Sequence, residues 1–413
     1  MAEKTSNLFT PRTFGPILSL LICCGKIALF SQTSFHAELQ LNDRLSLPFE
    51  VVYCEGKLPK LTVVNGEERI ELRYLLEKKD SIYFEFPEIA GRLVFHKTER
   101  KGYWLNLNKT LPAKIPFQFY EAQSLLHNLR LDERLDTLPH VFTGTYDVVF
   151  TDAKGTEKAI GIFQQNGAQI EGTFRTETGD YRFLSGGVVN GKMMISCFDG
   201  VHAFLFEATS TSGNGLSGTF YSGMRYQASW TGKLNPNAEL TSPYSISRPL
   251  KERAPLIIEV KNSKGKKRTL DQRFFQGKPS VVQIMGTWCP NCLDETRYFM
   301  SLKEKNAFKS VRFVMVGFEN GANDKDRLQR LNKYARKIAL NYGFYLGGEA
   351  STKQAGIVFH ALNGVYSFPT TLFLNKKGEI VQVHSGFDGP GTGVHFTHLQ
   401  EATEALLLKL LEE

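Results

Sequence analysis

The chain has 413 residues, a length that indicates two or three domains rather than one. Hydrophobic residues make up 42% and charged residues 22%, which is the composition of a folded protein and excludes long disordered stretches. The formal net charge of +8 is moderate, and lysines and arginines are interspersed with acids, so a nucleic-acid-binding surface has little support.

Residues 1–37 have the features of an export signal. Lys4 and Arg12 precede an apolar run that begins at Phe14, and polar residues follow it. Lys26 interrupts the apolar stretch, so its uninterrupted part is shorter than the ~20 residues that span a bilayer. We therefore predict an exported protein in which residues 1–37 are a signal peptide or an N-terminal membrane anchor.

Residues 38–235 have the pattern of a β-rich domain. Short apolar or alternating segments are separated by turn signals such as Asn65-Gly66, which is typical of an antiparallel barrel or sandwich. A subdivision of this part is expected near residues 120–143. The clearest strand candidates are 48–53, 60–64, 81–86, 103–107, 146–150, 161–163, 170–174, 193–197, 203–206 and 216–220.

The polar residues and cysteines of this part leave several interpretations open. Cys54 and Cys197 are expected to be buried as small hydrophobic residues, with a bridge between them as the alternative. Because the β-rich part has no close thiol pair and no metal-ligand cluster, we predict that it recognises or positions a partner and is not catalytic. Four polar residues could line a ligand pocket and could equally close the ends of strands: Asp180, Arg182, Asp199 and His202.

A linker and an α/β domain are expected in the C-terminal half. Residues 236–255 contain four prolines among polar residues, which is the composition of a linker. Residues 256–413 then alternate between strands and helices. Strands are expected at 256–260, 280–285, 311–317, 371–374 and 380–384, and helices near 290–305, 324–342 and 398–411.

Two thiols lie at the point where a buried strand is expected to pass into a helix. Cys289 and Cys292 follow the apolar run 281–285, and the helix begins beside them. The free N–H groups and the positive dipole of a helix start favour a thiolate, which can lower a cysteine pKa from ~8.5 to between ~3.5 and ~7.5. In this arrangement Cys289 attacks a partner, and Cys292 resolves the mixed disulfide within the same protein.

Zinc binding and a purely structural disulfide are the alternatives for two cysteines with this spacing. Zinc needs four ligands, and the other cysteines, at positions 23, 24, 54 and 197, form no second close pair. A structural bridge would not require Trp288 directly before it or a strand-to-helix setting. We therefore expect no metal and no cofactor.

A proline further along the chain supports a redox site. Pro369 stands directly before the apolar strand 371–374, where proline is awkward unless it has a specific task. We predict a cis peptide bond at Pro369, which would expose backbone groups that pair with an extended partner segment. An ordinary trans proline that opens an edge strand is the alternative.

These features together resemble thioredoxin-like proteins, and among them the exported bacterial thiol–disulfide oxidoreductases of the TlpA and ResA type. The resemblance covers about Pro255 to Glu413. The expected fold class is multidomain, with an N-terminal antiparallel β barrel or sandwich and a C-terminal α/β thioredoxin fold. The β-rich half is similar to the N-terminal extension of some exported TlpA-like proteins. The motifs that carry the resemblance are Trp288-Cys289-Pro290-Asn291-Cys292, Glu295 and Phe368-Pro369-Thr370-Thr371.

The resemblance implies roles for residues of this sequence. Ordinary thioredoxin has a buried aspartate at the position of Gln283, which cannot take a proton. Glu295 is expected to move protons in its place, with compensation of the helix dipole as the alternative role. Substrate contacts are expected from Trp288, Phe368 and Thr370. Catalytic roles are expected for Cys289, Cys292, Glu295 and Pro369.

These observations predict an exported thiol–disulfide oxidoreductase that exchanges its dithiol or disulfide with protein partners in the periplasm or cell envelope, as a reductant. One alternative is an envelope protein whose β-rich half binds a ligand or partner while the thioredoxin unit is accessory. Another is a thiol peroxidase, which is disfavoured because Pro279 is not spaced from Cys289 as a peroxidase loop requires.

Overall fold

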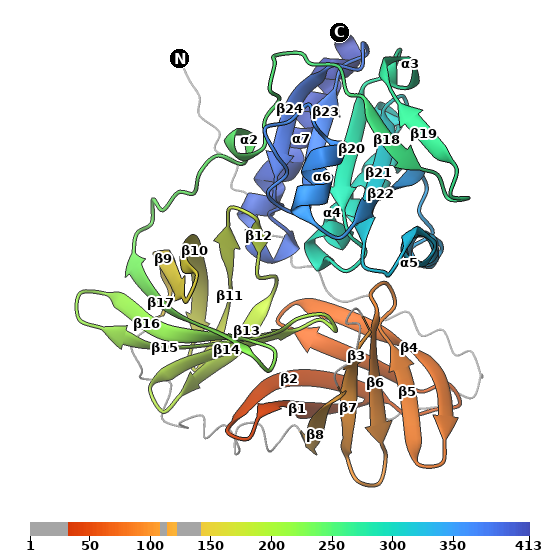
Figure 1. Ribbon diagram of the computed structural model, residues 1–413. Coiled ribbons are helices and arrows are strands. Elements are labelled where there is room, and N and C mark those ends of the chain that lie inside the picture. The colour runs from red at the N-terminus through yellow and green to blue at the C-terminus, as the bar shows by residue number, and fades with distance from the viewer. Residues whose placement is uncertain (1–31, 108–113, 122–141) are drawn as a thin grey trace, which may run out of the picture.

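The computed structural model describes residues 32–107, 114–121 and 142–413, which form three structural units (Figure 1). The first is a closed antiparallel barrel, the second a nine-stranded antiparallel sheet, and the third a seven-stranded mixed sheet with helices. In Figure 1 the mixed sheet lies above the two β units, and β12, α4 and α5 lie near their junction. The predicted fold class is confirmed, because antiparallel β structure precedes an α/β thioredoxin fold.

The first unit is a barrel in which each strand pairs with the next and β8 pairs back with β1. Alternate side chains fill its interior, as the two-residue period of a strand requires, and in β1 these include Ala37 and Leu39, which are fully buried. The strands are β1 (Gln32–Asn42), β2 (Leu45–Cys54), β3 (Lys60–Asn65), β4 (Glu68–Lys78), β5 (Ser81–Glu85), β6 (Gly91–His96), β7 (Lys101–Asn106) and β8 (Lys114–Glu121).

The β structure begins earlier than the sequence predicts, because β1 was not among the expected strands. Residues 32–37, assigned to the export segment, form the first half of β1, where Phe35 pairs with Val51 and Ala37 with Phe49 of β2. The apolar residues of this segment complete the barrel interior, which explains the earlier start. Residues 1–31 and the region 122–141, where a subdivision was expected, lie outside the described residues. Among the helices that the structure describes, none is long and apolar enough to cross a membrane.

The second unit follows at Gly144, and pairing of β10 with β11 joins the two sides of its sheet. Aromatic side chains fill it, and Gly172 allows close strand contact, since a Cβ there would collide with the carbonyl oxygen of Ile162. Cys54 of the barrel and Cys197 of this unit are both free thiols. The strands are β9 (Gly144–Asp152), β10 (Gly155–Asn166), β11 (Gln169–Thr176), β12 (Gly179–Asp180), β13 (Leu184–Val189), β14 (Lys192–Phe198), β15 (Ala203–Thr211), β16 (Gly215–Ser222) and β17 (Tyr226–Leu234).

The third unit has the strand order β19-β18-β22-β21-β20-β23-β24. Strand β20 is parallel to β21 and antiparallel to β23. Its strands are β18 (Ile258–Lys261), β19 (Lys267–Leu270), β20 (Ser280–Met285), β21 (Arg312–Glu319), β22 (Gly343–Glu349), β23 (Thr370–Leu374) and β24 (Ile380–Ser385). Its helical segments, with α2 before the sheet, are α2 (Pro243–Ile246), α3 (Gln272–Phe275), α4 (Pro290–Glu304), η3 (Asn306–Phe308), α5 (Asp324–Lys337), α6 (Thr352–Val358), η4 (Pro390–Thr392) and α7 (Val394–Glu412).

Both faces of this mixed sheet are covered. Val282 and Ile284 of β20 pack in one cluster with Phe275 of α3 and Ala355 of α6. Val281 of the same strand packs in a second cluster with residues of α4 and α7. Since β20 is buried on both faces, it is a continuous apolar run interrupted only by Gln283.

Several elements of this unit differ from the sequence prediction. The helix predicted over 324–342 ends at Lys337, because the chain turns at Ala339, which has a φ of 51°, and then enters β22. Strand β22 itself was not predicted. Helix α6 and strand β19 were also missed, since they are short and carry few buried residues.

Candidate active site

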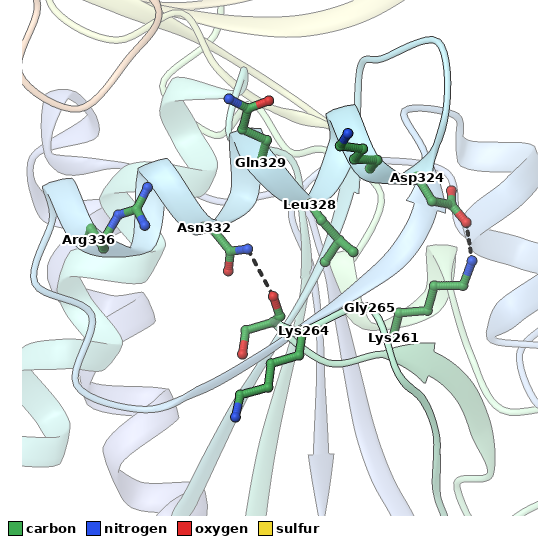
Figure 2. Close-up of a pocket in the computed structure, with 10 residues that line it drawn as sticks. Lys261, Lys264, Gly265, Asp324, Leu328, Gln329, Asn332 and Arg336 are labelled. Carbon is green, nitrogen blue, oxygen red and sulfur yellow. Dashed lines mark hydrogen bonds and ion pairs between the residues drawn. The ribbon is translucent and has the colours of Figure 1, made fainter.

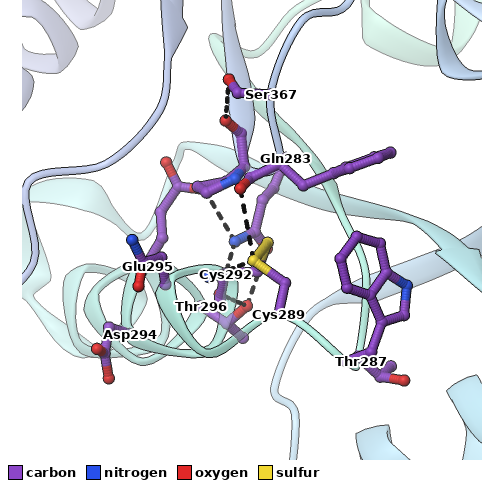
Figure 3. The surroundings of a disulfide bond; sticks show 12 residues. Gln283, Thr287, Cys289, Cys292, Asp294, Glu295, Thr296 and Ser367 are labelled. Carbon is purple, nitrogen blue, oxygen red and sulfur yellow. Dashed lines mark hydrogen bonds between the residues drawn. A yellow bond between two sulfur atoms is a disulfide. The ribbon is translucent and has the colours of Figure 1, made fainter. Parts of the chain in front are cut away.

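The dithiol lies where β20 ends and α4 begins (Figure 3). Cys289 is the N-cap residue of α4, and Cys292 lies in its first turn, so the two Cα atoms are 5.3 Å apart and the sulfur atoms form a disulfide. The backbone N–H of Cys292 donates toward Cys289 Sγ over 3.3 Å. After reduction, this N–H and the helix dipole favour a thiolate at Cys289.

The two sulfur atoms differ in their access to solvent. Cys289 is 9% exposed, whereas Cys292 is fully buried. Only Cys289 therefore offers a sulfur that an outside group can reach. This geometry supports the predicted division of roles, in which Cys289 attacks and Cys292 resolves.

The proline loop lies against the outer sulfur. The Phe368–Pro369 peptide bond is cis, as predicted, and Cys289 Sγ is 3.5 Å from the carbonyl oxygen of Phe368. The ring of Trp288 meets that of Phe368 edge to face, with centroids 5.4 Å apart. The indole N–H of Trp288 donates to the carbonyl oxygen of Phe318 at the end of β21. Four predicted site residues are thus brought together.

Thr370, by contrast, has its side chain in the interior. It is fully buried, and its hydroxyl donates to the carbonyl oxygen of Ser367 over 2.9 Å. The Ser367 hydroxyl in turn donates to the carbonyl oxygen of Pro369 over 3.0 Å. These bonds hold the proline loop in shape, so the structure places Thr370 behind the loop and away from its surface.

Glu295 is buried one turn beyond Cys292 on α4. One carboxylate oxygen accepts from the Gln283 amide over 2.9 Å, and the other accepts from the Thr371 hydroxyl over 2.8 Å. The same Gln283 amide donates to the carbonyl oxygen of Cys292 over 3.1 Å (Figure 3). Burial raises the pKa of Glu295 to about 8, although both hydrogen bonds oppose the shift. A carboxyl that titrates near neutral pH therefore lies beside the dithiol.

Glu319 is a second buried carboxyl that the sequence prediction missed. Its two oxygens accept from the backbone N–H of Thr287 over 2.9 Å and from the Thr287 hydroxyl over 2.6 Å. Burial raises the pKa of Glu319 to about 7. Its position at the carboxyl end of the apolar strand β21 could have revealed it, because the carboxyl ends of parallel strands meet at one edge of the sheet. Glu319 fixes the loop that carries Trp288 and Cys289.

The second β unit covers one side of this site. The side-chain amide of Asn291, between the two cysteines, donates to the carbonyl oxygen of Asp180 in β12 over 3.1 Å. The Asp180 carboxylate accepts from the backbone N–H of Gly389 in the loop after β24. Arg175 of β11 binds the Asp388 carboxylate through two hydrogen bonds of 2.8 and 2.7 Å. The β11–β12 region thus contacts both the start of α4 and the loop after β24.

Arg182 joins all three structural units. Its guanidinium lies 2.5 Å from Glu68 of the barrel, 2.5 Å from Asp294 of α4 and 3.4 Å from Asp199 of its own unit. The Nδ1 atom of His202 lies 3.0 Å from the same oxygen of the Asp199 carboxylate. Although burial opposes the shift, His202 and Arg182 lower the pKa of Asp199 to about 2. These polar residues were expected either to line a ligand pocket or to close the ends of strands. Because they pair with one another, the structure favours the second interpretation.

A separate pocket of about 640 Å³ lies on the third unit, between the β18–β19 turn and α5 (Figure 2). Lys264 and Arg336 contribute positive charge, and Lys261 pairs with Asp324. Asn332 donates to the carbonyl oxygen of Ser263 over 3.0 Å. The residues that line this pocket come from the β18–β19 turn and α5, and none belongs to the segments around the dithiol. We therefore assign the chemistry to the dithiol.

A thioredoxin fold with a dithiol at a helix start and a facing cis-proline defines a class of thiol–disulfide exchange proteins. Residues 249–400 match the Redoxin family model, and the C-terminal region of the chain is a redoxin domain.

Curated relatives match the same region. The thiol:disulfide interchange protein DsbE of Pasteurella multocida is 26% identical over 113 residues, which are 27% of this chain and 54% of the relative. DsbE of Tatumella citrea is 26% identical over 155 residues, which are 37% and 75%. The thiol-disulfide oxidoreductase ResA of Halalkalibacterium halodurans is 24% identical over 118 residues, which are 29% and 60%. The chain thus spans between about half and three quarters of the length of these relatives.

Solved structures are similar over the same part. StoA from Bacillus subtilis has 22% identity and a TM-score of 0.26, with 37% of this chain and 98% of that chain covered. A thioredoxin-like protein from Porphyromonas gingivalis has 21% identity and a TM-score of 0.30, with 38% and 94% covered.

Proposed function

We propose that this protein is an exported thiol–disulfide oxidoreductase that exchanges the Cys289–Cys292 couple with proteins of the cell envelope, as a reductant. The observation that carries the proposal is the outer sulfur of Cys289, which lies at the start of α4 and 3.5 Å from the carbonyl oxygen of Phe368. The proposal of export rests on the sequence features of residues 1–37. The proposed direction of electron transfer rests on the resemblance to TlpA- and ResA-type proteins.

The reaction follows from the geometry and balances in electrons and protons. The Cys289 thiolate attacks one sulfur of a partner disulfide, and the second partner sulfur leaves as a thiolate that takes up a proton. The Cys292 thiol then loses its proton and attacks Cys289 Sγ, and the partner sulfur bound there leaves as a thiolate. This thiolate takes up the proton that Cys292 lost, so the partner is released as a dithiol. Two electrons pass to the partner, and the protein is left with the disulfide that the structure contains.

Glu295 is suited to accept the proton that Cys292 loses. It is 3% exposed, its pKa is raised to about 8 by burial, and Gln283 links it to the backbone of Cys292. Pro369 holds the backbone that faces the partner, and the rings of Trp288 and Phe368 flank it. We further propose residues 38–235 as a unit that positions the partner without taking part in the chemistry.

Two serine variants of the full chain test the proposal. Cys289→Ser should abolish reduction of a model disulfide such as insulin, because no nucleophile remains at the reachable position. Cys292→Ser should instead accumulate mixed disulfides with the substrate, because attack survives and resolution does not. Turnover assays and non-reducing gels with mass spectrometry measure the two results. Full activity in either variant would refute the mechanism.

A further inference from the structure

A cavity of about 330 Å³ lies between the barrel and the second β unit, away from the dithiol. The outer face of β1–β3 forms one wall, and the β10–β11 turn with β13 and β14 forms the other. Its walls include the apolar residues Val64, Val189 and Met194. The volume falls at the lower end of the range for small-molecule sites, which are mostly apolar with a few polar groups.

His36 is the polar side chain on which the argument rests. It lines this cavity on the outer face of β1 and is only 1% exposed. Neither of its ring nitrogens has a hydrogen-bond partner in the part of the chain that the structure describes. The nearest carboxylate oxygen, from Glu38, is 3.7 Å from Nε2, which is beyond hydrogen-bond distance. A buried imidazole without a partner is unfavourable unless something in the cavity pairs with it.

We propose that this cavity binds a small neutral molecule that has an apolar ring or chain and one hydroxyl or carbonyl group. The apolar part packs against Val64, Val189 and Met194, and the polar group pairs with the ring of His36. A neutral imidazole can donate from one nitrogen and accept at the other, so it suits either kind of group.

The charges around the cavity select against an anion. Glu50 and Glu171 are among its lining residues, and the Glu38 carboxylate lies beside the His36 ring. The one lysine or arginine in the lining is Arg69, whose guanidinium already donates to the carbonyl oxygens of Gly66 and Glu68. A cation would lose its hydration against apolar walls. A neutral ligand avoids both penalties.

The cavity wall is also connected to the redox helix. Asn65 lines the cavity, and its amide donates to Glu68 over 3.0 Å. Glu68 accepts from Arg182, and Arg182 donates to Asp294 on α4. A ligand that displaces Asn65 would therefore act on the residues that hold α4 to the β units.

The test uses three probes with the same ring and different charge: benzyl alcohol, benzoate and benzylamine. Saturation-transfer NMR and titration with the full oxidised chain measure their affinities. Benzyl alcohol should bind at least tenfold more tightly than benzoate or benzylamine. His36→Phe keeps a planar aromatic ring but removes the hydrogen bond, and should weaken benzyl alcohol binding about tenfold.

Three further variants control the result. His96→Phe alters a barrel histidine that pairs with Ser81, and should leave benzyl alcohol binding unchanged. Ala168→Phe places a ring in the cavity and should abolish binding, which decides the question if the His36 variant does not fold. The same affinity for benzoate as for benzyl alcohol, or unchanged binding in both cavity variants, would overturn the proposal. Cys289→Ser should bind benzyl alcohol normally, which separates this proposal from the redox one.

Discussion

At the scale of single residues, an amide from the strand and a carboxyl from the helix lie together beside the dithiol. Gln283 of β20 is buried and hydrogen-bonds to Glu295 of α4, so the ionisable group comes from the helix and not from the strand. The Thr296 hydroxyl lies 3.0 Å from the side-chain oxygen of Gln283 and 2.7 Å from the carbonyl oxygen of Cys292, and these contacts fix the orientation of the amide. The carboxyl of Glu295 is therefore held in one place. A single substitution can remove its titration without moving its neighbours.

Glu295→Gln should abolish an inflection near pH 8 in the rate of disulfide exchange. The fold should survive, because the Thr371 hydroxyl that now donates to Glu295 can turn and accept from the new amide. The pKa of Glu295 is raised from 4.5 to about 8, so its stabilising effect is complete below pH 4.5 and is lost as the pH rises through 8. The variant should lose this share of the pH dependence of unfolding. An identical pH–rate profile would leave Glu295 with a helix-dipole role.

Thr371→Val should move the same inflection to higher pH. The Thr371 hydroxyl donates to the charged form of Glu295, so its removal raises the pKa of the carboxyl further. Thr370→Val is the matched control, because its buried hydroxyl donates to Ser367 and not to Glu295. Stopped-flow exchange across pH 6 to 10 compares the three proteins. Equal shifts in both variants would mean that loop geometry, and not the hydrogen bond, controls the inflection.

At the scale of elements, the local motifs were predictable and the contacts between distant elements were not. Cys289 and Cys292 at a strand-to-helix junction and the cis bond at Pro369 follow from neighbouring residues. Strand β22 was missed because its paired glycines and half-buried residues resemble a loop. Arg182 lies 114 residues from Glu68 and 112 from Asp294, so no local pattern reveals their contact.

Glu319→Gln should loosen the loop that connects β20 to α4. Both donors of Thr287 point at the Glu319 carboxylate, and an amide would present its own N–H groups to one of them. An unsatisfied buried donor costs about 1–3 kcal/mol, so the midpoint of urea unfolding should fall and exchange should slow. The pKa of Glu319 is raised from 4.5 to about 7, so its contribution to stability is lost as the pH rises through 7, and this slope should vanish in the variant. Thr287→Ser keeps both donors and should behave like the parent.

At the scale of the whole molecule, the dithiol lies at the junction of the three structural units. The sulfur atoms of the dithiol belong to one continuous apolar cluster with barrel residues such as Phe86 and Ile89. Arg297 of α4 pairs with Glu88 of the barrel, and Lys337 of α5 pairs with Glu85. The β units therefore do more than extend the chain, because they restrict the directions from which a partner can approach Cys289.

Arg182→Met should weaken the attachment of the redox unit to both β units. The side chain is 5% exposed, and its loss leaves the carboxylates of Glu68 and Asp294 buried without their shared cation. Removal of one partner from a buried ion pair costs about 3–5 kcal/mol, so calorimetry should show a transition several degrees lower. Alkylation of the reduced dithiol by a bulky maleimide should also become faster relative to iodoacetamide, because the junction opens. Arg297→Met is the matched control, since this half-exposed arginine also pairs with Asp294, and exposed pairs are worth only about 0–1 kcal/mol. If both variants change stability and access equally, the junction is held by its apolar contacts and not by Arg182.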